Sequence, residues 1–184
     1  MEKGASATHG AAEALVMRSY TQLAGYNAWA NARVFDAAEA LGAERCATPT
    51  GAFFGSITAT LNHLVVTDRI WLSRLLDTGE AQPPLDTLLE ADLSRLRALR
   101  VVEDERLKAL VAGLDPERLA GPITYANSSG RQFTQSCASA LDHLFNHQTH
   151  HRGQVHAMLT RLGGRAAAPS LDLIVFQREP APGR

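Results

Sequence analysis

Five of the seven histidines lie within fourteen residues, and this is the part of the chain whose side chains are best suited to chemistry. On a helix that turns about 100° per residue, His147 and His151 fall about 40° apart on one face. His143 and Gln154 lie close to them on the same face. That face adjoins an apolar stripe, so these side chains should point partly into the protein. The fifth histidine lies on the opposite side and is expected at the surface. In order, the residues are the pair His147 and His151, their neighbours His143 and Gln154, His150 at the edge of the face, and His156 opposite.

His147 and His151 have the i,i+4 spacing that lets two imidazoles bind one metal ion. His63, in an upstream segment with a helical apolar pattern, can supply a third ring if the two helices pack together. Three neutral histidines leave a coordination position for water or substrate, as in catalytic zinc sites. Gln154 or His143 can fix the ring tautomers by hydrogen bonding. The alternative is a polar seam of hydrogen-bonded histidines, with His63 a core residue.

Four long helices are predicted to position these residues. Apolar periodicity and capping signals indicate helices over 11–41, 56–77, about 86–111 and 134–162, the third with a charged, solvated face. Residues 123–134 are predicted to form a hairpin around a turn at 127–130. We therefore predict an all-α fold, a four-helix bundle with a short hairpin before the fourth long helix. Residues 1–10 are predicted to be disordered and residues 11–184 to form a single domain.

The composition excludes several classes of protein. The chain has 184 residues, of which 45% are hydrophobic and 20% charged, as in ordinary globular proteins. A net charge of −1 provides no basic excess to neutralise phosphates, so no nucleic-acid partner is expected. No apolar stretch has the length of a signal peptide or membrane span, so we expect a cytoplasmic protein with no membrane partner. Cys46 and Cys137 lack metal-binding spacing and are expected to be buried.

Several segments, taken together, resemble the DinB family. They are Tyr26-Asn27-Ala28-Trp29-Ala30-Asn31, Gly51-Ala52-Phe53-Phe54-Gly55-Ser56, Leu61-Asn62-His63-Leu64, Asp68-Arg69-Ile70-Trp71, Ile123-Thr124-Tyr125, His147-Gln148-Thr149-His150-His151-Arg152-Gly153-Gln154 and Ser170-Leu171-Asp172-Leu173. The resemblance implies an up-down-down-up four-helix bundle, often homodimeric, with a divalent metal ion held by three histidines. By motif position the ligands are His63, His147 and His151. His143, one turn earlier, is the main alternative ligand, and His150 lies in the same motif.

The resemblance also implies a class of reaction. Relatives of known activity are thiol-dependent transferases, isomerases and hydrolases that use a low-molecular-weight thiol such as mycothiol or bacillithiol. We expect a metal-dependent enzyme of thiol-transferase or hydrolase type that acts on a small-molecule substrate. The alternatives are a non-catalytic metal- or ligand-binding bundle dimer and a purely structural dimer.

The metal and the acid–base residues are less sharply defined by the sequence. A three-histidine site accepts zinc, nickel, copper or iron. Zinc is the ion expected in the cell, and nickel is expected after purification on nickel resin. The candidate catalytic residues are Gln154, Tyr26, Tyr125 and Asp68. Tyr26 also fits a core position, Asp68 fits an ion pair with Arg152, and Tyr125 lies in a hairpin that can cover the site.

Overall fold

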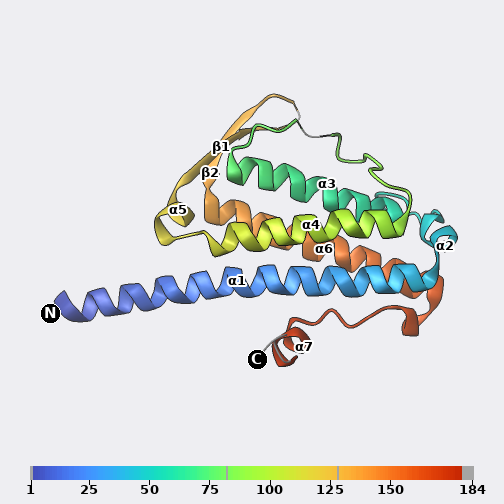
Figure 1. The fold of residues 1–184 in the computed structure, drawn as a ribbon, viewed down its shortest axis with the longest axis horizontal. Helices are drawn as coiled ribbons and strands as arrows, with labels where there is room; N and C mark the ends of the chain where they lie inside the picture. The colour runs from blue at the N-terminus through green and yellow to red at the C-terminus, as the bar shows by residue number, and fades with distance from the viewer. Residues whose placement is uncertain (1, 82, 128, 180–184) are drawn as a thin grey trace.

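The fold is mostly helical, with one small sheet. The computed structural model describes residues 2–81, 83–127 and 129–179. Its long helices are α1 (Glu2–Leu41), α3 (Ile57–Leu76), α4 (Leu93–Ala112) and α6 (Cys137–Gly163). Helices α1 and α3 each pack against both α4 and α6. Figure 1 shows α1 and α6 running in one direction and α3 and α4 in the other.

The shorter elements connect and cover these helices. They are α2 (Ala43–Ala47), α5 (Pro116–Ala120), the 3₁₀ helix η1 (Arg165–Ala167) and α7 (Leu173–Arg178). Strands β1 (Pro122–Ala126) and β2 (Gln132–Ser136) pair antiparallel, with Tyr125 opposite Phe133. The predicted hairpin before the last long helix is therefore confirmed.

The helices that carry the candidate ligands have clear boundary signals. Ser56 caps α3, because its side chain accepts a hydrogen bond from the Ala59 amide at 3.2 Å. Asp77 ends α3 in the left-handed conformation, with φ of 51°. Ser136 caps α6 in the same way, accepting from the Ser139 amide at 3.2 Å. The predicted limits of the second helix, Ser56 and Asp77, agree with the structure.

Two helices begin elsewhere than the sequence pattern indicated. Helix α4 begins at Leu93, after the cap residue Asp92, rather than near residue 86. The preceding residues form an irregular connection with a turn at residues 85–86, which Asn62 holds through hydrogen bonds with the carbonyl (2.9 Å) and the amide (3.0 Å) of Glu90. The helical backbone of α1 begins at Glu2, before Ala11 and within the segment predicted to be disordered. No proline interrupts that segment, and Figure 1 shows it extending past the other helices.

Two apolar clusters form the core, one toward each end of the long helices. The first includes Trp71, Leu107, Cys137 and Leu141, and the second includes Cys46 and other residues nearer α2, among them Val34, Ile57, Leu96 and Leu159. Each long helix contributes to both clusters. Cys46 and Cys137 are free thiols buried in these clusters, as expected.

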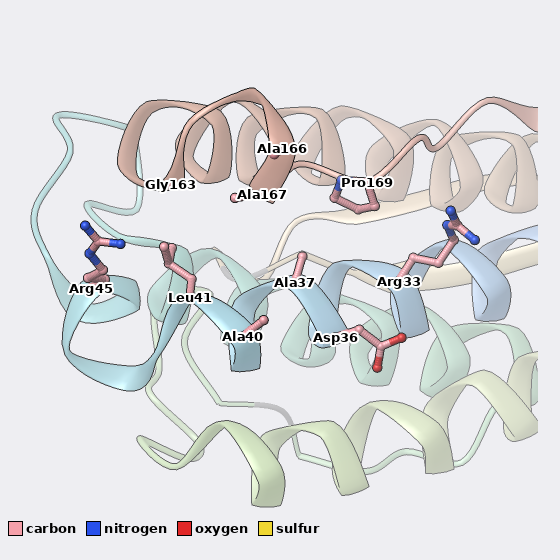
Figure 2. Close-up of a pocket in the computed structure, with 10 residues that line it drawn as sticks. All are labelled: Arg33, Asp36, Ala37, Ala40, Leu41, Arg45, Gly163, Ala166, Ala167 and Pro169. Atoms are coloured by element: carbon pink, nitrogen blue, oxygen red, sulfur yellow. The ribbon is translucent and has the colours of Figure 1, made fainter.

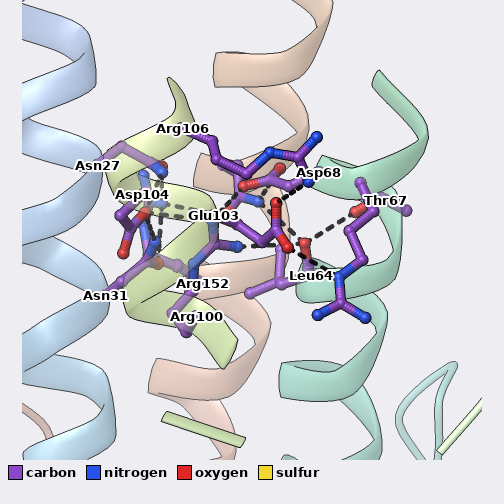
Figure 3. A network of polar contacts seen from close by, with 12 residues as sticks. Asn27, Asn31, Leu64, Thr67, Asp68, Arg100, Glu103, Asp104, Arg106 and Arg152 are labelled. Atoms are coloured by element: carbon purple, nitrogen blue, oxygen red, sulfur yellow. Dashed lines mark hydrogen bonds and ion pairs between the residues drawn. The ribbon is translucent and has the colours of Figure 1, made fainter. Parts of the chain in front are cut away.

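A layer of buried polar side chains separates the two clusters. Every long helix contributes to this polar layer, which consists of Asn27, Asn31, Asp68, Arg100, Asp104, Gln148 and Arg152 (Figure 3). Arg100 lies at its centre, with its Nη2 atom 2.6 Å from an Asp68 carboxylate oxygen and 3.2 Å from Asp104. Although burial disfavours a charge there, these two carboxylates raise the pKa of Arg100 above its ordinary value.

The other residues of the polar layer connect α1 and α6 to the two carboxylates that pair with Arg100. Asn31 donates to the Asp104 carboxylate at 2.9 Å, and Gln148 donates to Asp68. The expected ion pair between Asp68 and Arg152 is wrong. Asp68 pairs with Arg100 instead, because α4 brings that guanidinium between α3 and α1. Arg152 donates to the side chains of Asn27 and Asn31.

Candidate metal centre

Three histidine rings converge where α3 packs against α6. His63 comes from α3, and His147 and His151 come from consecutive turns of α6. One ring nitrogen from each residue lies within 4.8 Å of the other two, and no other group of three or more potential ligands gathers in this way among the described residues. His63 and His151 are buried, and His147 is partly exposed. The juxtaposition that the spacing predicted is thus present.

The spacing of the His63 and His147 ring nitrogens fits a shared metal ion. The Nε2 atoms of His63 and His147 are 3.2 Å apart. Two nitrogens that each lie about 2.0–2.1 Å from a tetrahedral zinc ion are themselves about 3.3 Å apart. The donor set is three imidazoles with no thiolate or carboxylate, which leaves a coordination position for a ligand from outside the protein.

Two of the rings are held through their outer nitrogens. His63 donates from Nδ1 to the Leu85 carbonyl at 2.9 Å, and His151 donates from Nδ1 to the Gln154 side-chain oxygen at 2.8 Å. With the proton on Nδ1, the Nε2 atom of each ring keeps its lone pair for a metal ion. Gln154 therefore lies where the helical face predicted, next to the cluster.

The cluster favours neutral rings. Burial, and after it the neighbouring histidines with His151 first, lower the pKa of His147 to about 3. Burial also lowers the pKa values of His63 and His151, although their hydrogen bonds act in the opposite direction. Because only unprotonated imidazole binds a metal ion, all three rings are ready to do so at neutral pH.

An aromatic side chain covers one side of the cluster. Phe54, from the segment between α2 and α3, stacks on His63 with ring centroids 3.8 Å apart and meets His151 edge-on at 5.5 Å. Such packing limits the orientations available to both rings and excludes water from that side. Sequence reasoning did not assign this role to Phe54.

The two alternative histidine ligands occupy different positions. His143 lies one turn before His147, with ring centroids 5.7 Å apart, and contacts Trp71 at 4.8 Å. His150 is exposed, and its ring contacts His151 at 4.7 Å. Neither belongs to the group of three nitrogens that lie close enough together to share an ion.

A cavity of about 700 Å³ opens onto the cluster. Its walls come from the second half of α3, the following connection, the hairpin and α6. His63, His143 and His147 line it, together with the candidate catalytic residue Tyr125. The Tyr125 ring packs edge-on against Trp71 at 5.3 Å, so the hairpin forms one wall of the cavity.

Two other candidate residues lie away from the cluster. Tyr26 donates its hydroxyl hydrogen to the Leu171 carbonyl at 2.6 Å, and it lines a separate cavity together with His156. Asp68 is buried in the polar layer, where it pairs with Arg100 and accepts a hydrogen bond from Gln148 (Figure 3). His156 thus lies on the side of α6 opposite the cluster, as the helical wheel predicted, although it is half-buried rather than at the surface.

A further cavity, of about 580 Å³, lies between the end of α1 and the segment that follows α6 (Figure 2). Arg33, Asp36 and Arg45 provide its charged groups, and alanines make up much of the remaining wall. Its lining includes none of the residues predicted for the site. The cavity beside the histidines, in contrast, combines space with two of the candidate metal ligands, His63 and His147.

Fold, motifs and site point to one class of protein, a small helical protein with a three-histidine cluster. A family model described as the DinB family matches residues 16–180, and the chain belongs to this family. The chain is 28% identical to Protein DinB of Bacillus subtilis (strain 168) over 157 residues, which cover 82% of this chain and 90% of that protein. No solved structure matches the chain. Among the described helices, none has the length and apolar character needed to cross a membrane.

Proposed function

We propose that His63, His147 and His151 bind one divalent metal ion and that the protein is a metal-dependent enzyme acting on a small molecule. The observation that carries the proposal is the convergence of three imidazoles, two of which, His63 and His147, line a cavity of about 700 Å³. Zinc is the ion proposed in the cell, and nickel is proposed for protein purified on nickel resin, because both bind imidazole well.

The proposed reaction is of the thiol-transferase or hydrolase type. When bound, such an ion lowers the pKa of water or of a thiol at the open position and so provides the nucleophile. The cavity would hold the substrate against Trp71 and Tyr125, within reach of that position. The low-molecular-weight thiol cosubstrate follows from the family and not from a contact in this chain.

The candidate catalytic residues receive different roles. Tyr125 is the proposed proton donor, since it lines the same cavity as His63 and His147. Gln154 is a positioning residue, because it acts through His151. Tyr26 and Asp68, which lie away from the cavity, have structural roles in this proposal.

The architecture belongs to the same proposal. The directions and contacts of α1, α3, α4 and α6 support an up-down-down-up four-helix bundle that forms a single domain over residues 11–184. A homodimer and a cytoplasmic location are proposed on the family resemblance. Light scattering in solution tests the dimer, and fractionation of the native cells tests the location.

Elemental analysis of tag-free protein purified without nickel tests the metal site directly. We expect about one metal ion per chain, lost in His147→Ala and retained in the control His156→Ala, whose side chain lies on the other side of α6. Protein that is metal-free and also fails to take up zinc or nickel would contradict the proposal. A bound ion without any thiol-dependent or hydrolytic turnover would favour the non-catalytic binding protein.

A further inference from the structure

We propose that Arg74 makes the cavity beside the histidines selective for substrates that carry a carboxylate group. The inference rests on the proposed function, because it assigns the substrate class of that same cavity. Arg74 lies in the last turn of α3 and lines the cavity together with His63 and His147.

A continuous row of aromatic contacts connects Arg74 to the candidate metal centre. The Arg74 guanidinium carbon lies 4.7 Å from the centroid of the Trp71 ring. Trp71 in turn contacts His143 at 4.8 Å, and His143 contacts His147 at 5.7 Å. A small molecule held at Arg74 therefore extends along this row toward the histidines.

The Arg74 guanidinium is oriented without being neutralised. It lies over the rings of both Trp71 and Tyr125, the latter at 4.3 Å, and it donates one hydrogen bond to the Ala126 carbonyl at 3.4 Å. The ion pairs found within the described part of the chain give it no carboxylate partner. Aromatic faces attract a cation but leave most of its N–H groups available to a ligand.

The two acidic residues that line the cavity form no ion pair with Arg74 within the described part of the chain. Asp77 and Glu80 are both exposed, whereas Arg74 is half-buried. Glu80 approaches Arg106 outside the cavity wall, with a nitrogen–oxygen distance of 3.9 Å. The acidic groups are thus more exposed than the cation, which lines the same cavity as the histidines.

A carboxylate is the group that this arrangement fits best. The planar guanidinium offers paired N–H groups that match the two oxygens of a carboxylate. Ile70, Trp71 and Pro84 provide apolar wall for the rest of the molecule. The inferred substrate class is a small organic acid with an apolar body whose reacting group lies at the histidines.

Calorimetric titration with 3-phenylpropanoate and its neutral analogue 3-phenylpropanamide tests the inference. We expect zinc-loaded protein to bind the acid about tenfold more tightly than the amide or better. Arg74→Gln should remove this difference and keep its metal content. The control Arg131→Gln should retain the difference, because Arg131 also lies over an aromatic ring, that of Phe133, but does not line the cavity.

Chelated protein separates Arg74 from the metal ion as the group that binds the acid. A preference for the acid that persists after chelation supports Arg74. A preference that disappears on chelation or survives in Arg74→Gln overturns the inference, as does equal or undetectable binding of acid and amide by the wild type. Metal content measured on the same samples shows separately whether the proposed function has failed.

Discussion

At the scale of single residues, hydrogen bonds to the outer ring nitrogens orient two of the three clustered histidines, His63 and His151. Gln154 could be expected beside His151, because three residues along a helix bring side chains to one face. The Leu85 carbonyl that accepts from His63 could not be expected, since it depends on the path of a long connection. Local helical geometry therefore predicted that His147 and His151 lie together, whereas the approach of His63 depends on the packing of α3 against α6, and part of what orients the rings comes from distant residues.

Stability of the metal-free protein should depend on pH through His147. An unfolded histidine titrates near pH 6.5, whereas folded His147 has a pKa of about 3. Between these values the unfolded state binds more protons, so stability falls as the pH drops below about 6.5 and recovers as the pH rises. We expect that lowering the pH from about 7.5 to about 5 decreases the free energy of unfolding of the wild type by about 1 kcal/mol more than that of His147→Gln, as measured by urea unfolding. Equal losses would contradict the lowered pKa.

Removing the Gln154 amide should weaken metal binding. Gln154→Leu frees the His151 ring, and we expect the dissociation constant for zinc to rise about tenfold or more. Competition with a chromophoric chelator measures this change. Gln177→Leu serves as the control, because its side chain bonds to Gln22 on the outer side of α1. An unchanged dissociation constant for zinc in Gln154→Leu would contradict a positioning role for Gln154.

At the scale of elements, α4 shows what the sequence pattern conceals. Its charged residues indicated a solvated face, yet Arg100 and Asp104 are buried in the polar layer. Helical periodicity distinguishes polar from apolar positions, but it does not reveal that carboxylates and amides from other helices meet a charge inside the protein. The start of α4 was misplaced for a similar reason, since Asn62, a distant residue, fixes the connection before it. Where the signals were local, as at Ser56, the boundary was correct.

Breaking the centre of the polar layer should be costly. Arg100→Met leaves Asp68 and Asp104 buried without their cation, and we expect the free energy of unfolding to fall by about 3–5 kcal/mol. The control Arg97→Met, one turn earlier on α4, loses only outer ion pairs with Asp36 and Glu39 and should cost at most about 1 kcal/mol. Urea unfolding of both variants measures the contrast. Equal effects would contradict a central role for Arg100.

At the scale of the whole molecule, metal binding should stabilise the fold, because the ligands lie on two helices that meet only in the folded chain. With free zinc at about 100 times its dissociation constant, the gain is about 2.7 kcal/mol. For a chain of this length that raises the melting temperature by about 5–10 °C. Scanning calorimetry with and without chelator measures the shift, which should be absent in His147→Ala. A shift that persists in this variant would place the ion elsewhere.

The side chains in the central part of α6 predict that its length is fixed. His147 lines the cavity and His151 lies beside it in the histidine cluster, while Gln148 and Arg152, each one residue later, face the polar layer. One inserted or deleted residue rotates everything after it by about 100°. A histidine ligand would then turn away from the cavity, and a polar-layer residue would turn away from its partners. The helix therefore has to keep the number of residues between these two sets of side chains. Insertions and deletions that arise in evolution should be confined to the connections outside this segment.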